Sequence, residues 1–335
     1  MLTNRLLKTA LILLASTGLV FGASAAQLKL ATVAPEGSAW MNAMRAGADE
    51  IKQRTDGRVS VKFYGGGVMG NEASVTRKIR IGQLHGGAFT TGGISRIYPD
   101  FGIYSLPFLF ESAEEAAYVR QHMDSVLIQG LEESGFIGFG LAQGGFGKLM
   151  SADKMRTLDD LKGKKLWVPE DDDMSFEVMR ELGLSPVKLP LTDVLTGLQT
   201  QLLEIVGTSA IGAIALQWHT KIKYVLDQPL VYIYGTLVID KRFFSKLDAA
   251  DQVIVKEVFG RVYKKIDADN YADNINAEKA LRENGVSFDK GEKQEVDKIV
   301  QQVHDFIENK VAEGKVSKDL YNMAQQHIKD YRTSQ

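Results

Sequence analysis

Strand-like and helix-like patterns alternate along the chain, and this alternation limits the possible folds more than any other feature. Residues 27–34 and 58–64 alternate between apolar and polar side chains, as strands with one buried face do. Residues 39–55 carry apolar side chains at helical spacing, and a helix capped by Asn71 precedes a short strand over 84–90. Such an order is typical of a mostly parallel sheet with helices on both faces. The sequence therefore predicts an α/β fold.

The same order of elements recurs in the second half of the chain. Residues 165–168 and 187–189 have strand-like patterns, and each is followed by a helical pattern, over 174–182 and 192–203 respectively. A separate strand over 231–239 precedes a charged, mainly helical region. We therefore expect two lobes, each built on its own set of strands.

Glycines mark the expected connection between the two lobes. Gly144, Gly145 and Gly147 directly follow a strand predicted over 136–143, and glycine adopts the backbone angles that a hinge requires. The strand over 231–239 is expected to return the chain to the first lobe. The predicted division is residues 27–147 with 239–279 for the first lobe and residues 148–238 with 280–335 for the second lobe.

The N-terminal segment, residues 1–26, has the pattern of a secretory signal peptide. Arg5 and Lys8 precede an apolar run over 10–21, and small residues end the segment, which places the cleavage site near Ala25 or Ala26. This apolar run is shorter than the roughly 20 residues of a membrane span. We expect export to the periplasm, with no insertion of the mature chain into the membrane.

Composition excludes several classes of function. The sequence contains no cysteine, which rules out disulfides, thiolate metal sites, cysteine nucleophiles and lipid attachment through cysteine. Removing residues 1–26 takes away two of 40 basic residues and none of 42 acidic ones, leaving a net charge of about −4. This balance predicts no nucleic-acid partner and no attraction to an anionic membrane.

A glycine-rich segment, Gly65-Gly66-Gly67-Val68-Met69-Gly70, matches the Gly-x-Gly-x-x-Gly pattern of dinucleotide-binding proteins. That pattern belongs to the first strand of a nucleotide-binding unit, and the next strand then ends in an acidic residue. Here the glycines follow the second strand, and the strand over 84–90 ends without an acid. A tight turn between strand and helix is therefore the favoured interpretation, and no cofactor is predicted.

The sequence carries no hydrolase or metalloprotease motif. Neither Gly-x-Ser-x-Gly nor His-Glu-x-x-His is present, and the five histidines form no pair at ligand spacing. His219, beside Trp218, is interpreted as a partly buried helix histidine. We therefore predict no catalytic residues and no enzyme activity.

The densest acidic cluster is Glu170 with the three aspartates of residues 171–173. Carboxylates at this density are able to bind a hard cation. They equally suit the start of a helix at Met174, where negative charge favours the positive end of the helix dipole. Capping is the favoured role, and no metal site is predicted. Because this loop follows a strand, some of its acids are expected to face a ligand cleft.

The order of motifs along the chain resembles the extracytoplasmic solute receptors of TRAP transporters, of the DctP type. The resemblance spans almost the whole mature chain and rests on residues 28–38, 55–59, 63–72, 98–99 with 106–110, 159–169, 194–200 and 223–224. It implies two α/β lobes joined by crossing strands and a long helix, with a ligand cleft between them. It also implies that a separate membrane permease, driven by an ion gradient, receives the ligand. A monomer is expected.

The departures from the family pattern lie at the expected ligand site. Where the pattern Lys-Gly-x-Lys-x-Arg-Val-Pro has the arginine that grips the ligand carboxylate, this sequence has Trp167. Trp167 is either an aromatic wall of the cleft or a core tryptophan. The candidate wall residues are Trp167, Phe89, Leu191 and Pro169; the candidate hydrogen-bonding residues are Thr90, Thr91, Glu170 and Thr208; Lys148 is the candidate cation, and Glu36 and Ser38 are weaker candidates.

Two hypotheses for the ligand remain open from the sequence. A small organic acid is what the resemblance implies, and it would rely on Lys148 or on backbone N–H groups. An aromatic, apolar or cationic ligand would match Trp167 and the acidic loop. A sensor or scavenger that works without a permease would share all of these sequence features.

Overall fold

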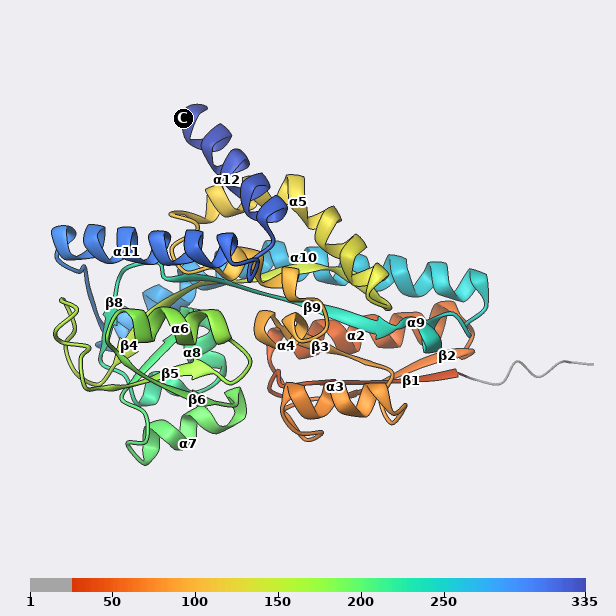
Figure 1. Cartoon of the computed structure of the whole chain (residues 1–335). Coiled ribbons are helices and arrows are strands. Elements are labelled where there is room, and N and C mark those ends of the chain that lie inside the picture. The colour runs from red at the N-terminus through yellow and green to blue at the C-terminus, as the bar shows by residue number, and fades with distance from the viewer. Residues whose placement is uncertain (1–25) are drawn as a thin grey trace, which may run out of the picture.

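The computed structural model describes residues 26–335, so the predicted signal peptide lies outside the described residues except for its last residue, Ala26. Figure 1 shows two groups of strands and helices side by side, with β9 and α10 extending along both groups. The first lobe contains β1–β3 and α2–α4, and the second contains β5–β8 and α6–α8. Within residues 26–335, no helix combines the length and the apolar character that crossing a membrane requires.

The strands are β1 (Ala26–Thr32), β2 (Val59–Tyr64), β3 (Gly86–Thr90), β4 (Phe136–Ser151), β5 (Lys165–Pro169), β6 (Ser185–Leu189), β7 (Ile205–Thr208), β8 (Tyr224–Leu226), β9 (Val231–Asp240) and β10 (Ser287–Asp289). The α-helices are α2 (Ala39–Arg54), α3 (Glu72–Arg80), α4 (Thr91–Ser95), α5 (Ala113–Glu133), α6 (Asp173–Glu181), α7 (Val194–Gln199), α8 (Ala210–Ala215), α9 (Lys241–Phe244), α10 (Ala249–Glu283), α11 (Lys293–Ala312) and α12 (Lys318–Thr333). Short 3-10 helices are η1 (Pro99–Ser105), η2 (Leu191–Asp193) and η3 (Trp218–Thr220).

One strand, β4, belongs to the sheets of both lobes. In the first sheet the order is β2-β1-β3-β9-β4, with β1 parallel to β2 and β3, and with β9 antiparallel to β3 and β4. β4 pairs with β9 as far as Gly147 and with β7 from Lys148 onward. In the second sheet, β7, β5 and β6 then follow in that order. The mixed α/β two-lobe fold predicted from the sequence is confirmed.

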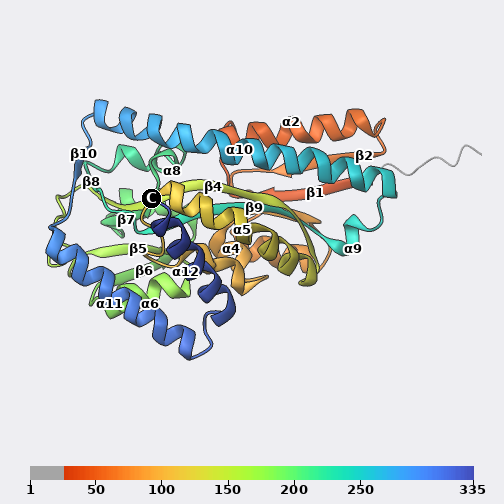
Figure 2. The same cartoon turned by 90° about the horizontal axis from the view of Figure 1, so that it is seen from above.

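The position of β9 corrects the predicted lobe division. Residues 231–238 were assigned to the second lobe, but β9 pairs along its whole length with β3 and β4 in the first sheet. The chain thus returns to the first lobe at the start of β9, about eight residues earlier than predicted. In addition, α12 packs against α5; Figure 2 shows α12 turning back from the end of α11 toward α5.

The crossing glycines are held by the long helix α10. Gly145 has a φ of +85°, and the pairing of β4 with β9 is irregular between Gln143 and Gly145. Asn274 of α10 donates from Nδ2 to the Gly144 carbonyl at 3.1 Å and accepts from the Ile211 N–H at 3.3 Å. A Cβ on Gly145 would lie 2.3 Å from Asn274 Nδ2, so only glycine fits there. Asn274 therefore links the crossing strand to α8 of the second lobe.

A buried arginine connects α5 with α10 and with the strands β4 and β9. Arg120 of α5 is 6% exposed and donates to Asp124 at 2.9 Å and to Asp267 of α10 at 2.7 Å. The same guanidinium donates to the Tyr232 hydroxyl of β9 and to the Leu141 carbonyl of β4, each at 3.1 Å. One side chain thus fixes two helices and two strands.

Buried apolar residues form three cores. One lies between the first sheet and the helices α2 and α10, and includes Met41, Phe63 and Phe259. A second lies in the second lobe around Trp167 and Trp218. The third is continuous across both lobes beneath α5, α11 and α12. This shared core and the strand crossings join the two lobes into one unit.

Candidate functional site

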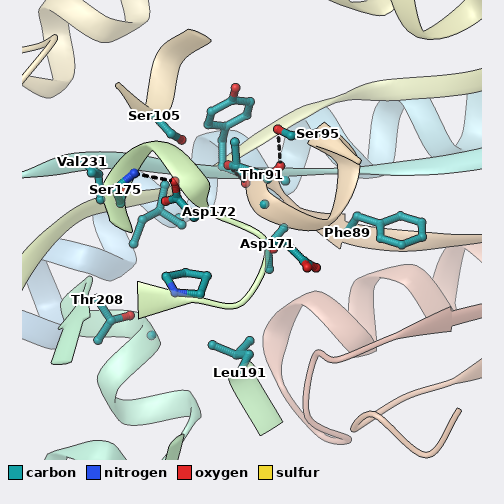
Figure 3. Close-up of a pocket in the computed structure, with 18 of the residues that line it drawn as sticks. Phe89, Thr91, Ser95, Ser105, Asp171, Asp172, Ser175, Leu191, Thr208 and Val231 are labelled. Atoms are coloured by element: carbon teal, nitrogen blue, oxygen red, sulfur yellow. Dashed lines mark hydrogen bonds between the residues drawn. The ribbon is translucent and has the colours of Figure 1, made fainter. Parts of the chain in front are cut away.

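A cavity of about 1130 Å³ lies between the lobes and is lined by residues from both of them. Figure 3 shows part of this cleft, with Thr91 from the first lobe and Asp171, Asp172, Leu191 and Thr208 from the second. The cleft lining includes all but one of the candidate ligand residues, namely Glu36, Ser38, Phe89, Thr90, Thr91, Trp167, Pro169, Glu170, Leu191 and Thr208. The exception is Lys148.

Trp167 is mainly a core residue of the second lobe. It is 5% exposed, and its ring packs edge-to-face against Trp218 with the ring centroids 5.1 Å apart. Its indole N–H donates to the Leu189 carbonyl at 2.9 Å. The side chain therefore has little surface left to act as a stacking platform, and of the two interpretations open from the sequence the structure favours the core tryptophan.

Lys148 does not face the cleft, which corrects its prediction as the cation that meets an anionic ligand. Its ammonium group lies 2.7 Å from an Asp227 carboxylate oxygen and 2.6 Å from a Glu278 carboxylate oxygen. The side chain is 13% exposed. Side chains alternate along β4, and Lys148 lies one residue past the crossing. Its side chain therefore points toward α10, whereas the side chain of its neighbour Leu149 lines the cleft.

The acidic loop after β5 joins the two lobes. Asp172 caps α6, since its carboxylate accepts from the Ser175 N–H at 2.9 Å, and this confirms the predicted capping role. Glu170 accepts a hydrogen bond from Asn71 Nδ2 of the first lobe at 2.6 Å. Asp171 forms an ion pair with Arg96, which follows α4 of the first lobe. The loop therefore holds the cleft in a closed arrangement.

The glycine-rich turn after β2 also meets the second lobe. Gly66 and Gly67 have positive φ angles, and their N–H groups donate to the carbonyls of Ala34 and Thr32 at the end of β1. A Cβ on Gly67 would lie 2.7 Å from the Thr192 methyl carbon of the second lobe. The predicted tight turn is confirmed, and its lack of side chains allows the lobes to approach closely.

Several candidate polar side chains are used to fix the local backbone. Ser38 caps α2 by accepting from the Met41 N–H at 3.3 Å. The Thr91 hydroxyl donates to the Tyr234 carbonyl at 2.8 Å. Glu36 forms an ion pair with Arg45 at 2.6 Å on the exposed rim. These residues shape the cleft wall, and each already has a partner in the protein.

Glu72 is a cleft residue that the sequence did not indicate as a site residue. It begins α3, and its carboxylate accepts from the Thr90 N–H at 2.6 Å and from the Thr90 hydroxyl at 2.7 Å. A Cβ on Gly93 would lie 2.5 Å from Glu72 Cδ, so α4 covers the carboxylate closely. Burial, together with the nearby charges of Asp171 and Glu170, raises the pKa of Glu72 from 4.5 to about 7. The signal in the sequence is the segment Gly70-Asn71-Glu72, which leads from the glycine-rich turn into α3.

We expect the stability difference between the wild type and Glu72→Gln to depend on pH. Because the pKa of Glu72 is raised on folding, ionisation of this carboxyl destabilises the folded state as pH rises from 4.5 through about 7. The variant should therefore gain about 3 kcal/mol relative to the wild type between pH 4.5 and pH 8. Urea unfolding at both pH values measures this. Glu308→Gln, on the exposed surface of α11, is the control, and parallel pH curves for wild type and Glu72→Gln would contradict the prediction.

Arg96 and Asn71 are further cleft residues that pattern reasoning missed. Asn71 was recognised as the cap of α3, where it accepts from the Ser74 N–H at 3.0 Å, but its contact with Glu170 joins positions 99 residues apart. Arg96 follows α4, a five-residue helix that the glycine-rich sequence did not indicate. No local signal in the sequence pairs either residue with the acidic loop.

Two α/β lobes joined by crossing strands and a long helix, with a closed cleft lined from both sides, define a two-lobe receptor for small solutes. The chain belongs to family 7 of the bacterial extracellular solute-binding proteins, whose model matches residues 30–311. This confirms the resemblance to the DctP-type receptors of TRAP transporters. Its members are extracytoplasmic receptors.

Relatives and solved structures agree with this assignment. An uncharacterized protein of Salmonella typhimurium, YiiZ, is 26% identical over 275 residues, covering 78% of this chain and 81% of that protein. The sugar acid binding protein DctPAm from Advenella mimigardefordensis, solved with galactonate, has a TM-score of 0.83 at 21% identity and covers 91% of this chain and 98% of its own. A TRAP periplasmic solute binding protein from Ralstonia eutropha, solved with (S)-2-acetolactate, has a TM-score of 0.83 at 22% identity, with coverages of 91% and 99%.

Proposed function

We propose that this protein binds one small organic molecule in the cleft between its lobes and delivers it to a TRAP-type membrane permease. The observation that carries the proposal is the cavity of about 1130 Å³ between the lobes, which is large enough to hold a small organic molecule and is lined from both lobes. Because a ligand there touches both lobes, it favours the closed form through its better fit to that form. The protein acts as a periplasmic monomer without catalysis, and residues 1–26 serve for export.

Two receptors of similar fold were solved with their ligands bound. Galactonate and acetolactate, the ligands of the two solved structures described above, are small organic acids. Delivery to a permease follows from membership of the family and is tested by transport: deleting the receptor should abolish uptake of the ligand into cells that retain the permease. Unchanged uptake would instead favour a sensor or scavenger.

The absence of cysteine makes lobe closure directly measurable. Ile81 of the first lobe and Leu202 of the second lobe are exposed, so Ile81→Cys with Leu202→Cys gives one dye pair across the cleft. We expect some members of a library of organic acids, amines and polyols to raise both the melting temperature and the energy transfer between the dyes. The control pair is Ile81, at the end of α3, and Val253, in the part of α10 that packs on the first-sheet core; it should show unchanged transfer. A library that changes neither quantity would contradict the receptor function.

A further inference from the structure

Basic side chains in the cleft are few, and those inside it already have partners. Among the cleft-lining residues that the structure describes, the basic ones are Arg96, Lys310 and Lys315. Arg96 is paired with Asp171, and Lys310 lies 2.8 Å from a Glu177 carboxylate oxygen. Lys315 is an exposed residue in the turn after α11. The cleft therefore offers no free guanidinium or ammonium group deep enough to hold an anionic ligand.

Acidic side chains outnumber the basic ones. Eight line the cleft: Glu36, Glu72, Asp100, Glu170, Asp171, Asp172, Asp173 and Glu177. Within residues 26–335, Glu72, Glu170 and Asp172 have no basic side chain within ion-pair distance, although all three surround the contact between the lobes. The cleft thus holds carboxyl groups without basic partners next to the cavity.

Glu170 is the acid best placed to meet a ligand. One of its carboxylate oxygens accepts from Asn71 across the lobe boundary at 2.6 Å, and the other has no hydrogen-bonding partner in the part of the chain that the structure describes. The side chain is partly exposed to the cavity. Burial and the charge of Asp171 raise the pKa of Glu170, and burial raises the pKa of Asp172. A positive charge beside these groups would favour their ionised forms.

Closure of the lobes brings the acidic loop of the second lobe against the first lobe, so the charge of this loop affects closure. Glu170 and Asp171 belong to the second lobe, whereas their partners Asn71 and Arg96 belong to the first lobe. A cation bound beside Glu170 would therefore lie at the lobe boundary and would reduce the repulsion among the acids when the lobes close. An organic anion would add to that repulsion instead.

We infer that the ligand of this receptor carries a protonated amine and that the free carboxylate oxygen of Glu170 accepts a hydrogen bond from it. The inference rests on the proposed receptor function and specifies its ligand class. Charge-assisted hydrogen bonds of this kind are among the stronger polar contacts in a desolvated site. Half-buried Trp40 and the apolar walls of the cleft contact the rest of the molecule.

Matched pairs of probes test the charge of the ligand. The purified protein is titrated at pH 6.5 with putrescine and succinate, tyramine and 4-hydroxyphenylacetate, and D-glucosamine and D-glucuronate, using calorimetry and melting temperature. In parallel, the protein is denatured directly after purification, and any small molecule released is identified by mass spectrometry. We expect at least one amine to bind ten times more tightly than its matched acid, or the released molecule to be an amine.

Tighter binding of an acid than of its matched amine, or release of a carboxylic acid without an amino group, would overturn the inference and leave the receptor function standing. If the six probes fail to bind and no small molecule is released, the library members that close the dye pair decide: closure only with compounds that lack an amine overturns the inference, and closure with no member means that the receptor function fails and the inference with it. The dye-pair measurement of lobe closure reports on receptor function separately, because it does not depend on ligand charge.

Glu170→Gln tests the specific residue. The glutamine keeps the shape and an oxygen that accepts from Asn71, and it removes only the charge. We expect the affinity for the bound amine to fall about tenfold, whereas Glu308→Gln on α11 leaves it unchanged. Equal affinities of wild type and Glu170→Gln, at equal melting temperatures, would overturn the assignment of Glu170.

Discussion

Trp167→Ala is expected to lower the free energy of unfolding by about 3–5 kcal/mol, which is the range for removing a large buried aromatic side chain. The indole is 5% exposed and packs against Trp218, and its N–H donates to the Leu189 carbonyl. The substitution leaves a cavity in the core of the second lobe and an unpaired carbonyl. Urea or thermal unfolding of the purified variant measures the loss.

Two further variants separate this structural role from a role in binding. Trp167→Phe keeps most of the apolar volume and loses the hydrogen bond to Leu189, so its loss of stability should be smaller. Trp40→Ala removes a half-buried tryptophan from the cleft side of the first lobe and should also cost less. If Trp167→Ala retained wild-type stability but lost more than tenfold in ligand affinity, the interpretation as an aromatic wall would be restored.

Arg120→Ala is expected to destabilise the fold by about 3 kcal/mol, because it leaves two partly buried carboxylates, a buried hydroxyl and a carbonyl without their donor. Arg120 is 6% exposed and holds Asp124 and Asp267 while it also donates to Tyr232 and Leu141. Its removal weakens the contact of α5 with α10 and with both crossing strands. Equilibrium unfolding in urea measures the effect.

A surface ion pair gives the matched control for this prediction. Arg261 lies 2.6 Å from Glu50, and its side chain is 59% exposed. Arg261→Ala should change the free energy of unfolding by less than about 1 kcal/mol, as exposed pairs generally do. Similar losses for Arg120→Ala and Arg261→Ala would show that the buried network contributes little.

The local elements were largely predictable because they depend on short-range patterns. Capping chemistry visible in the sequence marks several helix ends. These are the starts at Ser38 and Asn71, the acidic cap of α6 and the end of α10 near Asn284. Short strands were missed where their residues form no alternating pattern. β7 has four residues and β8 and β10 have three each, so their pairing with distant strands decides their structure.

The cleft itself was less predictable, since its chemistry depends on pairs that are far apart in sequence. Most candidate residues do line the cavity, because they sit at strand ends on the side where open α/β sheets bind ligands. The prediction that Lys148 meets the ligand was wrong because its ammonium group pairs with Asp227 and Glu278. These partners lie 79 and 130 residues away, so no local pattern indicates them. The sequence left two interpretations of Trp167 open, because its burial depends on Trp218, 51 positions further along.

The pairing of β9 with β3 and β4 governs the order in which the protein can be assembled. Both partners of β9 are made long before it, since Phe89 of β3 pairs opposite Thr236. Until residue 240 is available, β3 and β4 each expose a strand edge, and unpaired edges of this kind favour aggregation. The first sheet therefore stays incomplete while the N-terminal half is made alone. A fragment that ends before β9 should be prone to aggregation, and β9 has to be made before the first lobe is complete.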